Sequence, residues 1–278
     1  MDQNNEDFPE TKDILAKDAV AGCLSGRWVG KNLEVYSEID STNNRAKQLG
    51  LEGAPHGTLI ISDLQTAGKG RRGRGWLMPR GEGLTFSILT RPQLPPDAVS
   101  MLTLAAALAV SKGIDMTAGC RTQIKWPNDI VLNRKKICGI LTEGSADSEC
   151  VHYAVVGIGV NVSSEIFPRE LKEKASSIYI ETGKKPGRIK LLNIICSCFE
   201  DYYAVLLKYG DLSALKKEYD SKLAGRGNVV VIEDKNKSRQ GICLGITERG
   251  SMLVRFQDGK EEEVLSGEVS VRGLYGYI

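Results

Sequence analysis

The chain has 278 residues, of which 41% are apolar, and its formal net charge is +2 at pH 7. That length allows one large domain and a small one with an ordinary hydrophobic core. The near-neutral charge excludes the overall basic footprint of a nucleic-acid binder, so any functional positive charge must be local.

The first half of the chain alternates helical and extended patterns. Apolar spacing over residues 12–24 predicts a helix, and the alternation over Leu33–Ile39 predicts a strand. Small polar residues at 40–43 then suit a helix N-cap. Further elements are expected in this order: a strand at Thr58–Ser62, a glycine-rich loop, a strand at Leu84–Thr90 and a buried helix at Ala98–Thr117.

The middle of the chain predicts a β-hairpin followed by a buried strand. Gln123–Pro127 reads as a strand ended by proline, and turns separate the strands Ile130–Leu132 and Ile137–Glu143. We therefore expect Lys125 and Lys136 on paired strands. The next elements are a strand at Val151–Val162 and helices at about 188–208 and 211–222.

From Gly225 the pattern changes to short strands separated by turns, as in a small β-barrel. The expected strands are Val229–Glu233, Gly241–Ile246, Ser251–Arg255 and Glu262–Leu265. We place a domain boundary near residue 223. The predicted division is an N-terminal segment with a short helix (1–30), a catalytic domain (31–222) and a small C-terminal domain (223–278).

Cysteine usage and the ends of the chain bear on its compartment. Seven cysteines form an odd set without a CxxC pair, which argues against a disulfide framework and a zinc ribbon. The start, MDQNNEDFPE, is no signal peptide, and the longest apolar run, Met101–Val110, is shorter than the roughly 20 residues that span a bilayer. We expect a cytoplasmic protein with no membrane partner.

The two histidines, His56 and His152, are far apart in the sequence. Catalytic triads and most zinc sites need histidines that work beside other reactive or ligating groups. We therefore expect neither a histidine-based metal site nor Ser-His-Asp catalysis.

The densest functional signal is Gln65–Trp76, QTAGKGRRGRGW, with four cations and four glycines in twelve residues. Glycines let backbone N–H groups approach a phosphate or carboxylate, while lysine and arginine neutralise it. Between Gln65 and Arg91 there are six basic residues and one acidic residue, Glu82. A solvated basic loop is the plain alternative, but such loops rarely need so many glycines.

Gly68–Gly73 formally fits the GxGxxG fingerprint of dinucleotide-binding folds. That fingerprint must open a helix, whereas Arg74–Pro79 is a poor helix start and no acidic residue follows about 20 positions on. A P-loop is excluded because glycine, not serine or threonine, follows Lys69. The loop must bind anions in another architecture.

Two further strings are unusual: Lys125–Asp129, KWPND, and Gly157–Asn161, GIGVN. The first could be a strand end with an Asx turn and a core tryptophan, yet Lys125 and Lys136 could also form a second cationic cluster. The second could bring backbone close to a flat ring, or could simply pack tightly against a helix.

Together these strings resemble the biotin protein ligase family. The ordered set is Asp40–Asn43, Gln65–Arg74 with Trp76, Lys125–Asp129, Lys136–Gly139 and Gly157–Asn161. The resemblance covers about residues 33–278 and includes the end Ser266–Arg272. It implies an α+β fold: a mixed-sheet catalytic domain like that of class II aminoacyl-tRNA synthetases, with an SH3-like C-terminal barrel. About 30 residues precede the first expected strand, too few for the DNA-binding domain of bifunctional members, so the chain resembles the monofunctional class and no DNA binding is expected.

The resemblance implies a two-step reaction. Biotin and ATP give biotinyl-5′-AMP and pyrophosphate, and the acyl group then passes to a lysine of a biotin carboxyl carrier domain, such as that of acetyl-CoA carboxylase. Two like charges about 4 Å apart repel by about 4 kcal/mol at an effective dielectric near 20, so attack of a carboxylate on a phosphate needs nearby cations. Arg71 and Lys136 are the expected catalytic pair.

The resemblance also assigns the remaining site residues. Biotin is expected to contact Ser41, Thr42, Asn43, Gln65, Gly68, Lys69, Gly70, Arg71, Trp76, Lys136, Gly139 and Gly157. ATP and the adenylate are expected to contact Lys69, Arg71, Arg74, Trp76, Lys125 and Asn161. Asp129 is the expected ligand of Mg²⁺. Lys69 departs from many relatives, which carry arginine there, and lysine loses the bidentate geometry.

The resemblance suggests that two loops, 66–80 and 164–176, close over the ligands and protect the mixed anhydride from water. We predict that both are mobile without ligands. The alternatives are a lipoate protein ligase, a biotin-binding paralogue without ligase activity, and a nucleic-acid-binding module, which the lone aromatic beside the loop disfavours. A homodimer is possible.

Overall fold

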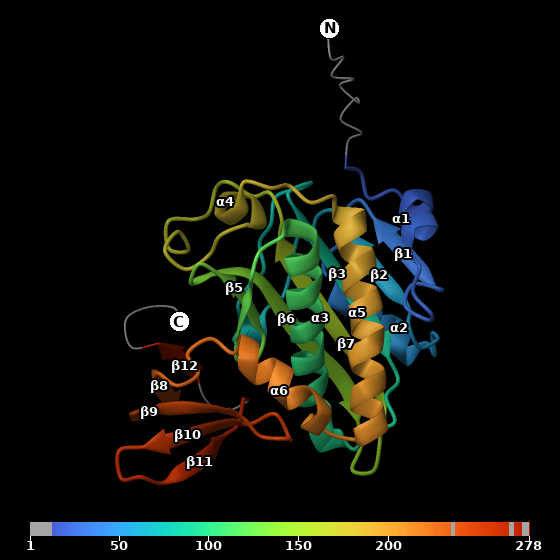
Figure 1. The fold of residues 1–278 in the computed structure, drawn as a ribbon. Helices are drawn as coiled ribbons and strands as arrows, with labels where there is room; N and C mark the ends of the chain where they lie inside the picture. The colour runs from blue at the N-terminus through green and yellow to red at the C-terminus, as the bar shows by residue number, and fades with distance from the viewer. Residues whose placement is uncertain (1–12, 235–236, 267–269, 274–277) are drawn as a thin grey trace, which may run out of the picture.

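The computed structural model describes residues 13–234, 237–266, 270–273 and 278 (Figure 1). In these residues the chain forms two β-sheets, one of seven strands and one of five, with helices packed on the larger sheet. The predicted combination of a mixed-sheet domain and a smaller β-rich C-terminal part is confirmed.

The large sheet has the strand order β1-β2-β3-β7-β6-β5-β4. Only β1 and β2 are parallel, and every other neighbouring pair is antiparallel. The strands are β1 (Leu33–Tyr36), β2 (Leu59–Ser62), β3 (Gly83–Thr90), β4 (Gln123–Lys125), β5 (Asp129–Leu132), β6 (Lys135–Ala146) and β7 (Val151–Asn161).

One detail of the predicted hairpin is wrong. Lys125 on β4 and Lys136 on β6 are not on paired strands, because β5 lies between them. The turn at Asn128 returns the chain directly along β4, where Asp129 is the partner of Lys125. Asp129 is therefore next to both lysines: it is the strand partner of Lys125 and forms an ion pair with Lys136.

The helices are α1 (Lys17–Cys23), α2 (Thr42–Leu51), α3 (Ser100–Ala118), α4 (Ile178–Thr182), α5 (Arg188–Tyr209) and α6 (Ser213–Lys222), with 3₁₀ turns at Arg71–Gly73 and Pro96–Ala98. The short helix expected within residues 1–30 is α1. Helix α1 begins at Lys17, whereas the predicted helix began at residue 12. Residue 12 itself lies outside the described residues. Helix α4 was not predicted, since five residues are too few to show a helical period.

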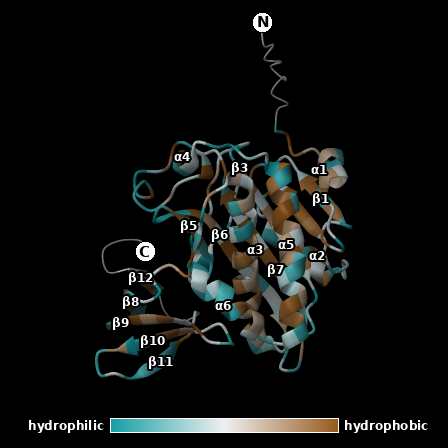
Figure 2. Cartoon of the chain, viewed as in Figure 1, coloured by the Kyte–Doolittle hydropathy of each residue, from teal (hydrophilic) through white to brown (hydrophobic). Residues whose placement is uncertain are grey.

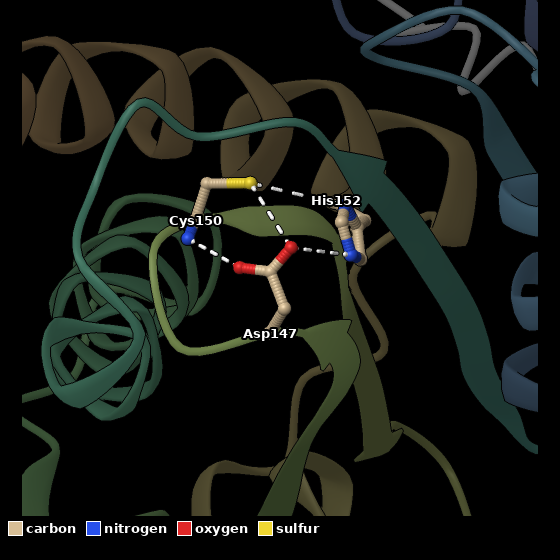
Figure 3. A group of neighbouring side chains, drawn as sticks. All are labelled: Asp147, Cys150 and His152. Carbon is tan, nitrogen blue, oxygen red and sulfur yellow. Dashed lines mark hydrogen bonds and ion pairs between the residues drawn. The ribbon is translucent and has the colours of Figure 1, made fainter.

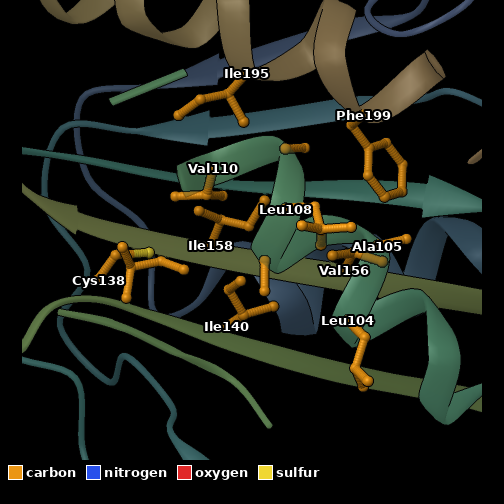
Figure 4. Close-up of a cluster of buried hydrophobic side chains, with 14 of the residues drawn as sticks. Leu104, Ala105, Leu108, Val110, Cys138, Ile140, Val156, Ile158, Ile195 and Phe199 are labelled. Atoms are coloured by element: carbon orange, nitrogen blue, oxygen red, sulfur yellow. The ribbon is translucent and has the colours of Figure 1, made fainter. Parts of the chain in front are cut away.

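The main core lies between the large sheet and the helices α3 and α5. Leu108 and Val110 of α3, Ile195 and Phe199 of α5 and Ile158 of β7 are all buried in one cluster (Figure 4). Figure 2 shows hydrophobic residues concentrated along these helices and strands. Pro96–Ala118 passes as a candidate membrane span by length and composition, although 67% of its most apolar window is buried in the fold. Its apolar composition is therefore explained by packing in this core.

Helix α2 covers the opposite face of the large sheet. Its residues Ala46 and Leu49 pack in a second, smaller cluster with Ile60, Leu89 and Val155 of the strands. Because side chains alternate along β7, Val156 and Ile158 face the main core while Gly157 faces α2. The N-terminus of α2 is thus held directly over a glycine of the sheet.

The small sheet has the order β11-β10-β9-β8-β12, with all neighbours antiparallel. Its strands are β8 (Val229–Asp234), β9 (Lys237–Ile246), β10 (Met252–Phe256), β11 (Glu261–Val264) and β12 (Ser270–Gly273). This arrangement is consistent with the expected SH3-like domain. Helix α6 ends at Lys222, so we keep the boundary near residue 223 as a proposal.

Candidate active site

A cavity of about 50 Å³ lies on the α2 face of the large sheet. Five parts of the chain contribute to its wall: the N-terminus of α2, the glycine-rich loop, the turn before β5, the first half of β6 and the second half of β7. The lining residues are Ser41, Thr42, Asn43, Gln65, Lys69, Gly70, Arg71, Trp76, Asn128, Lys136, Gly139, Ile140, Leu141, Gly157, Ile158 and Gly159.

One end of the cavity is a buried polar network at the start of α2. Ser41 caps this helix by accepting the Asn44 N–H, as its small polar side chain predicted. The Oε1 atom of Gln65 accepts the Thr42 N–H at 2.8 Å and its hydroxyl at 3.1 Å. Because buried polar groups must be paired, this network holds donors and acceptors in fixed positions.

Asn43 is the most constrained member of this network. Its Oδ1 accepts the Ser87 hydroxyl at 2.6 Å, and its Nδ2 donates to Glu143 Oε2 at 2.8 Å. A Cβ atom on Gly157 would lie 2.0 Å from Asn43 Oδ1. The glycine at position 157 is therefore what allows the Asn43 amide to lie flat on the sheet.

The glycine-rich loop folds as a small hairpin and opens no helix, in agreement with the rejection of a dinucleotide fingerprint. Gly70 N–H donates to Arg74 O at 2.7 Å and Trp76 N–H to Gly68 O at 2.9 Å. Gly68 does not line the cavity; a Cβ there would lie 2.3 Å from Trp76 O, so it is needed for the close approach of the two chain segments. The turn between them contains Arg72 with φ 58.

Trp76 lies across the sheet at the mouth of the loop. A Cβ on Gly159 would be 2.4 Å from Trp76 Cε2, and one on Gly139 would be 3.2 Å from Cζ3. These two glycines are register partners on β7 and β6 and leave room for the indole. Among the described residues the buried Nε1 of Trp76 has no hydrogen-bond acceptor.

The other end of the cavity is cationic. Arg71 donates from Nη1 to Asn128 Oδ1 at 2.9 Å and from Nη2 to the carbonyl of Ser266 in the small domain. Burial lowers the pKa of the Arg71 guanidinium, which nevertheless stays charged because arginine is so basic. Lys136 pairs with Asp129 Oδ1 at 2.6 Å, and its ammonium lies 5.6 Å from the centre of the Trp76 ring.

The expected phosphate-binding cations stand around this end, but only Lys69 lines the cavity. Its ammonium donates to Asn44 Oδ1 at 2.6 Å. Burial lowers the pKa of Lys125 to about 8. The nearby carboxylate of Asp129 raises this pKa, whereas the positive charges of Lys136 and Arg74 lower it further. Lys125 and Arg74 thus lie in the electrostatic field of the cationic end without lining the cavity.

Asn161 is buried and does not line the cavity. Its Nδ2 donates to Ser176 O at 2.9 Å, and the backbone of Lys136 exchanges hydrogen bonds with Lys174 and Ser176. The loop 164–176 is therefore anchored at its end beside the cationic cluster, next to Lys136.

Sequence reasoning missed five lining residues: Asn128, Ile140, Leu141, Ile158 and Gly159. Asn128 and Gly159 were inside motifs already singled out. Two signals were available: Gly159 shares a strand face with Gly157 at a spacing of two, and Asn128 is the polar residue at the turn of KWPND. The three aliphatic residues gave no signal.

The comparisons agree with this geometry. Residues 35–161 match the model of the biotin/lipoate A/B protein ligase family. The chain is 39% identical over 247 residues to the bifunctional ligase/repressor BirA of Bacillus spizizenii, covering 88% of this chain and 76% of that protein. It is 33% identical to the biotin–[acetyl-CoA-carboxylase] ligase of Mycobacterium tuberculosis, covering 94% of this chain and 96% of the relative. The chain belongs to this ligase family.

A solved structure supports the same family membership. The biotin protein ligase of Aquifex aeolicus in complex with biotin and ATP superimposes with a TM-score of 0.76 at 32% sequence identity. The match covers 87% of this chain and 99% of the Aquifex chain. Within the biotin/lipoate ligase family, the resemblance inferred from motifs is thus confirmed at the level of the whole fold.

Proposed function

We infer that the chain is an ATP-dependent biotin protein ligase. The observation that carries this inference is the division of one cavity into a buried polar end at α2 and a cationic end at Arg71 and Lys136. Relatives named as biotin ligases and a neighbour solved with biotin and ATP support it. The cavity can therefore receive a small acid whose two ends differ strongly in polarity.

We propose that the ureido ring of biotin occupies the polar end. Thr42, Asn43 and Gln65 supply amide and hydroxyl groups that can both donate and accept. Leu141, the register partner of Gly157, lies on the cavity face of the sheet and suits an apolar ring and acyl chain. The biotin carboxylate would then point to the cationic end.

The chemistry has two balanced steps. A carboxylate oxygen attacks the α-phosphorus of ATP, and the bond to pyrophosphate breaks as the acyl-phosphate bond forms. The amine of the carrier lysine then attacks the acyl carbon, and AMP leaves. Arg71 and Lys136 reduce the repulsion between carboxylate and phosphate and stabilise the charge that develops during transfer.

We propose that Lys69, Arg74 and Lys125 hold the β- and γ-phosphates, while Trp76, Gly139 and Asn161 lie along the adenylate. Magnesium enters as the counter-ion of ATP. Asp129 stays the proposed magnesium ligand, but its carboxylate pairs with Lys136, so coordination would have to act through water or replace that ion pair. We derive no step through the metal.

The proposed acceptor is a lysine of a biotin carboxyl carrier domain, and the proposed compartment is the cytoplasm, in keeping with seven free cysteines. The described residues before β1 hold one seven-residue helix, so we propose no DNA-binding role for them. The small sheet is proposed to be SH3-like. Homodimer formation stays open as a prediction.

The test is a mass measurement after mixing the protein with biotin, Mg-ATP and a purified carrier domain. One biotin increment on the carrier is expected. Arg71→Ala and Lys136→Ala should each lower adenylate formation at least tenfold, whereas Lys135→Ala, the adjacent control, should not. Near-normal turnover in both variants would contradict the assignment of the catalytic pair.

A second measurement separates the alternatives. When biotin and lipoate are compared in ATP–pyrophosphate exchange, lipoate should support exchange if the chain is a lipoate ligase, and biotin should support it if the chain is a biotin ligase. Biotin binding without any exchange would identify a paralogue that lacks ligase activity.

A further inference from the structure

A mixed group of ligating side chains lies at the turn between β6 and β7. Asp147, Cys150 and His152 are exposed, and one ligand atom of each lies within 4.8 Å of the others (Figure 3). His152 Nε2 is 3.3 Å from Asp147 Oδ2, and Cys150 Sγ is 3.8 Å from the same oxygen and 3.9 Å from His152 Nδ1. No such group was found elsewhere in the part of the chain that the structure describes.

The turn holds these side chains in place. Asp147 Oδ1 accepts the N–H groups of Glu149 and Cys150 at 2.8 Å each, and Asp147 N–H donates to Cys150 O at 3.1 Å. The carboxylate is thereby oriented with Oδ2 towards the sulfur and the ring. His152 is the second residue of β7, and Cys150 lies two residues earlier, in the turn just before the strand.

The position of the imidazole is fixed from the strand as well. The carbonyl of His152 accepts a hydrogen bond from Arg91 Nη1 at 3.0 Å, and β7 runs through the middle of the large sheet. The backbone that carries His152 is therefore part of the rigid scaffold, and Asp147 and Cys150 are tied to it by the turn. All three side chains are exposed, so an ion can reach them.

We propose that Asp147, Cys150 and His152 bind a divalent transition-metal ion of the zinc class, with water completing a tetrahedron. Zinc accepts thiolate, imidazole and carboxylate ligands at about 2.0–2.3 Å, which gives edges of roughly 3.3–3.8 Å between ligand atoms. Asp147 Oδ2 lies 3.3 Å from His152 Nε2 and 3.8 Å from Cys150 Sγ, which matches those edges, and the remaining pair of ligand atoms lies within 4.8 Å. Magnesium and calcium are disfavoured, because they select oxygen ligands.

Sequence analysis expected no histidine-based metal site because it considered the two histidines, which are far apart. The site uses only His152 and takes its other ligands from the hairpin turn. It is also separate from the proposed active site: Gly157 is five residues from His152 along β7, or about 17 Å at the rise of a strand. Metal binding here is therefore independent of the proposed ligase chemistry.

The test is zinc binding to the full chain under reducing conditions, measured by competition with a chromogenic chelator. One ion per chain is expected. Cys150→Ser and His152→Gln should each weaken binding at least tenfold, whereas Cys23→Ser, the control for a thiol elsewhere, should leave it unchanged. Binding that survives in the Cys150→Ser/His152→Gln double variant would overturn the proposal, as would no binding to the unaltered chain.

Cobalt(II) supplies a direct readout of the ligands. The unaltered chain should give the visible bands of tetrahedral cobalt and a thiolate-to-cobalt charge-transfer band, and Cys150→Ser should lose the latter. A spectrum without the charge-transfer band would contradict sulfur ligation. Biotin transfer by the Cys150→Ser variant should equal that of the unaltered chain, which keeps this test apart from the test of ligase activity.

Discussion

Gly157 shows at the scale of one residue how the backbone sets ligand recognition. We predict that Gly157→Ala weakens biotin binding at least tenfold, because its Cβ would lie 2.0 Å from Asn43 Oδ1 and must displace the amide. Calorimetry with biotin alone measures this. Gly22→Ala is the control, since a Cβ there has nothing within 4 Å. Unchanged affinity in Gly157→Ala would show that the Asn43 amide does not recognise biotin.

Lys125 gives a prediction about pH. Burial lowers its pKa to about 8, so in the free protein it is charged below that pH and increasingly neutral above it. If it holds a phosphate as a cation, the KM for ATP should rise several-fold between pH 7 and pH 9. Lys125→Arg should flatten that rise, because arginine stays charged.

The control for this prediction is Lys217→Arg, an exposed lysine on α6. It should keep the pH profile of the unaltered protein. A Lys125→Arg profile identical to that of the unaltered chain would remove Lys125 from the group of phosphate-binding residues.

Much of the site could be predicted from residue types and spacing. Every expected biotin contact except Gly68 lines the cavity, because glycines and cations at fixed spacing leave few alternative roles. Asn128 could not be assigned, since its partners, Arg71 and the carbonyl of Ile140, come from distant parts of the chain. Gly68 lies outside the lining, and its close neighbour is the Trp76 carbonyl across the loop, which the sequence does not show.

At the scale of elements, sequence patterns predicted the long strands and helices. They did not predict which strands are neighbours in the sheet. The buried, largely apolar patterns of β7 and α3 predicted both elements nearly to their ends. The order β4-β5-β6 was missed because the turn at Asn128 is tight, and a sequence pattern shows which strands exist rather than which are neighbours.

The two loops at the cavity give the prediction at this scale. Residues 66–80 carry Trp76, whose buried Nε1 has no acceptor among the described residues, and a bound ligand can supply one. Hydrogen exchange of the backbone at 66–80 and 164–176 should slow several-fold when biotin and ATP are added together. The core helix α3 serves as the internal reference. Equal exchange with and without ligands would contradict closure of the loops.

For the molecule as a whole, the C-terminal part that holds the small sheet contacts Arg71, the proposed catalytic arginine. The Ser266 carbonyl accepts from Arg71 Nη2, and Trp126 Nε1 donates to Gly250 O at 2.9 Å. A third connection is buried Asp220 on α6, which accepts the Ile246 N–H of β9 at 2.9 Å. The position of Arg71 therefore depends on how the small sheet is attached to α6 and β4.

We predict that Asp220→Ala lowers stability and activity together. It leaves the Ile246 N–H buried without its acceptor, which costs about 1–3 kcal/mol, and it loosens the sheet that presents Ser266 to Arg71. Urea unfolding should show the loss of stability, and adenylate formation should fall several-fold although Asp220 does not line the cavity. The exposed Asp258→Ala, in the same small domain, should change neither. A destabilised Asp220→Ala protein with full activity would mean that Arg71 keeps its position without support from the small sheet.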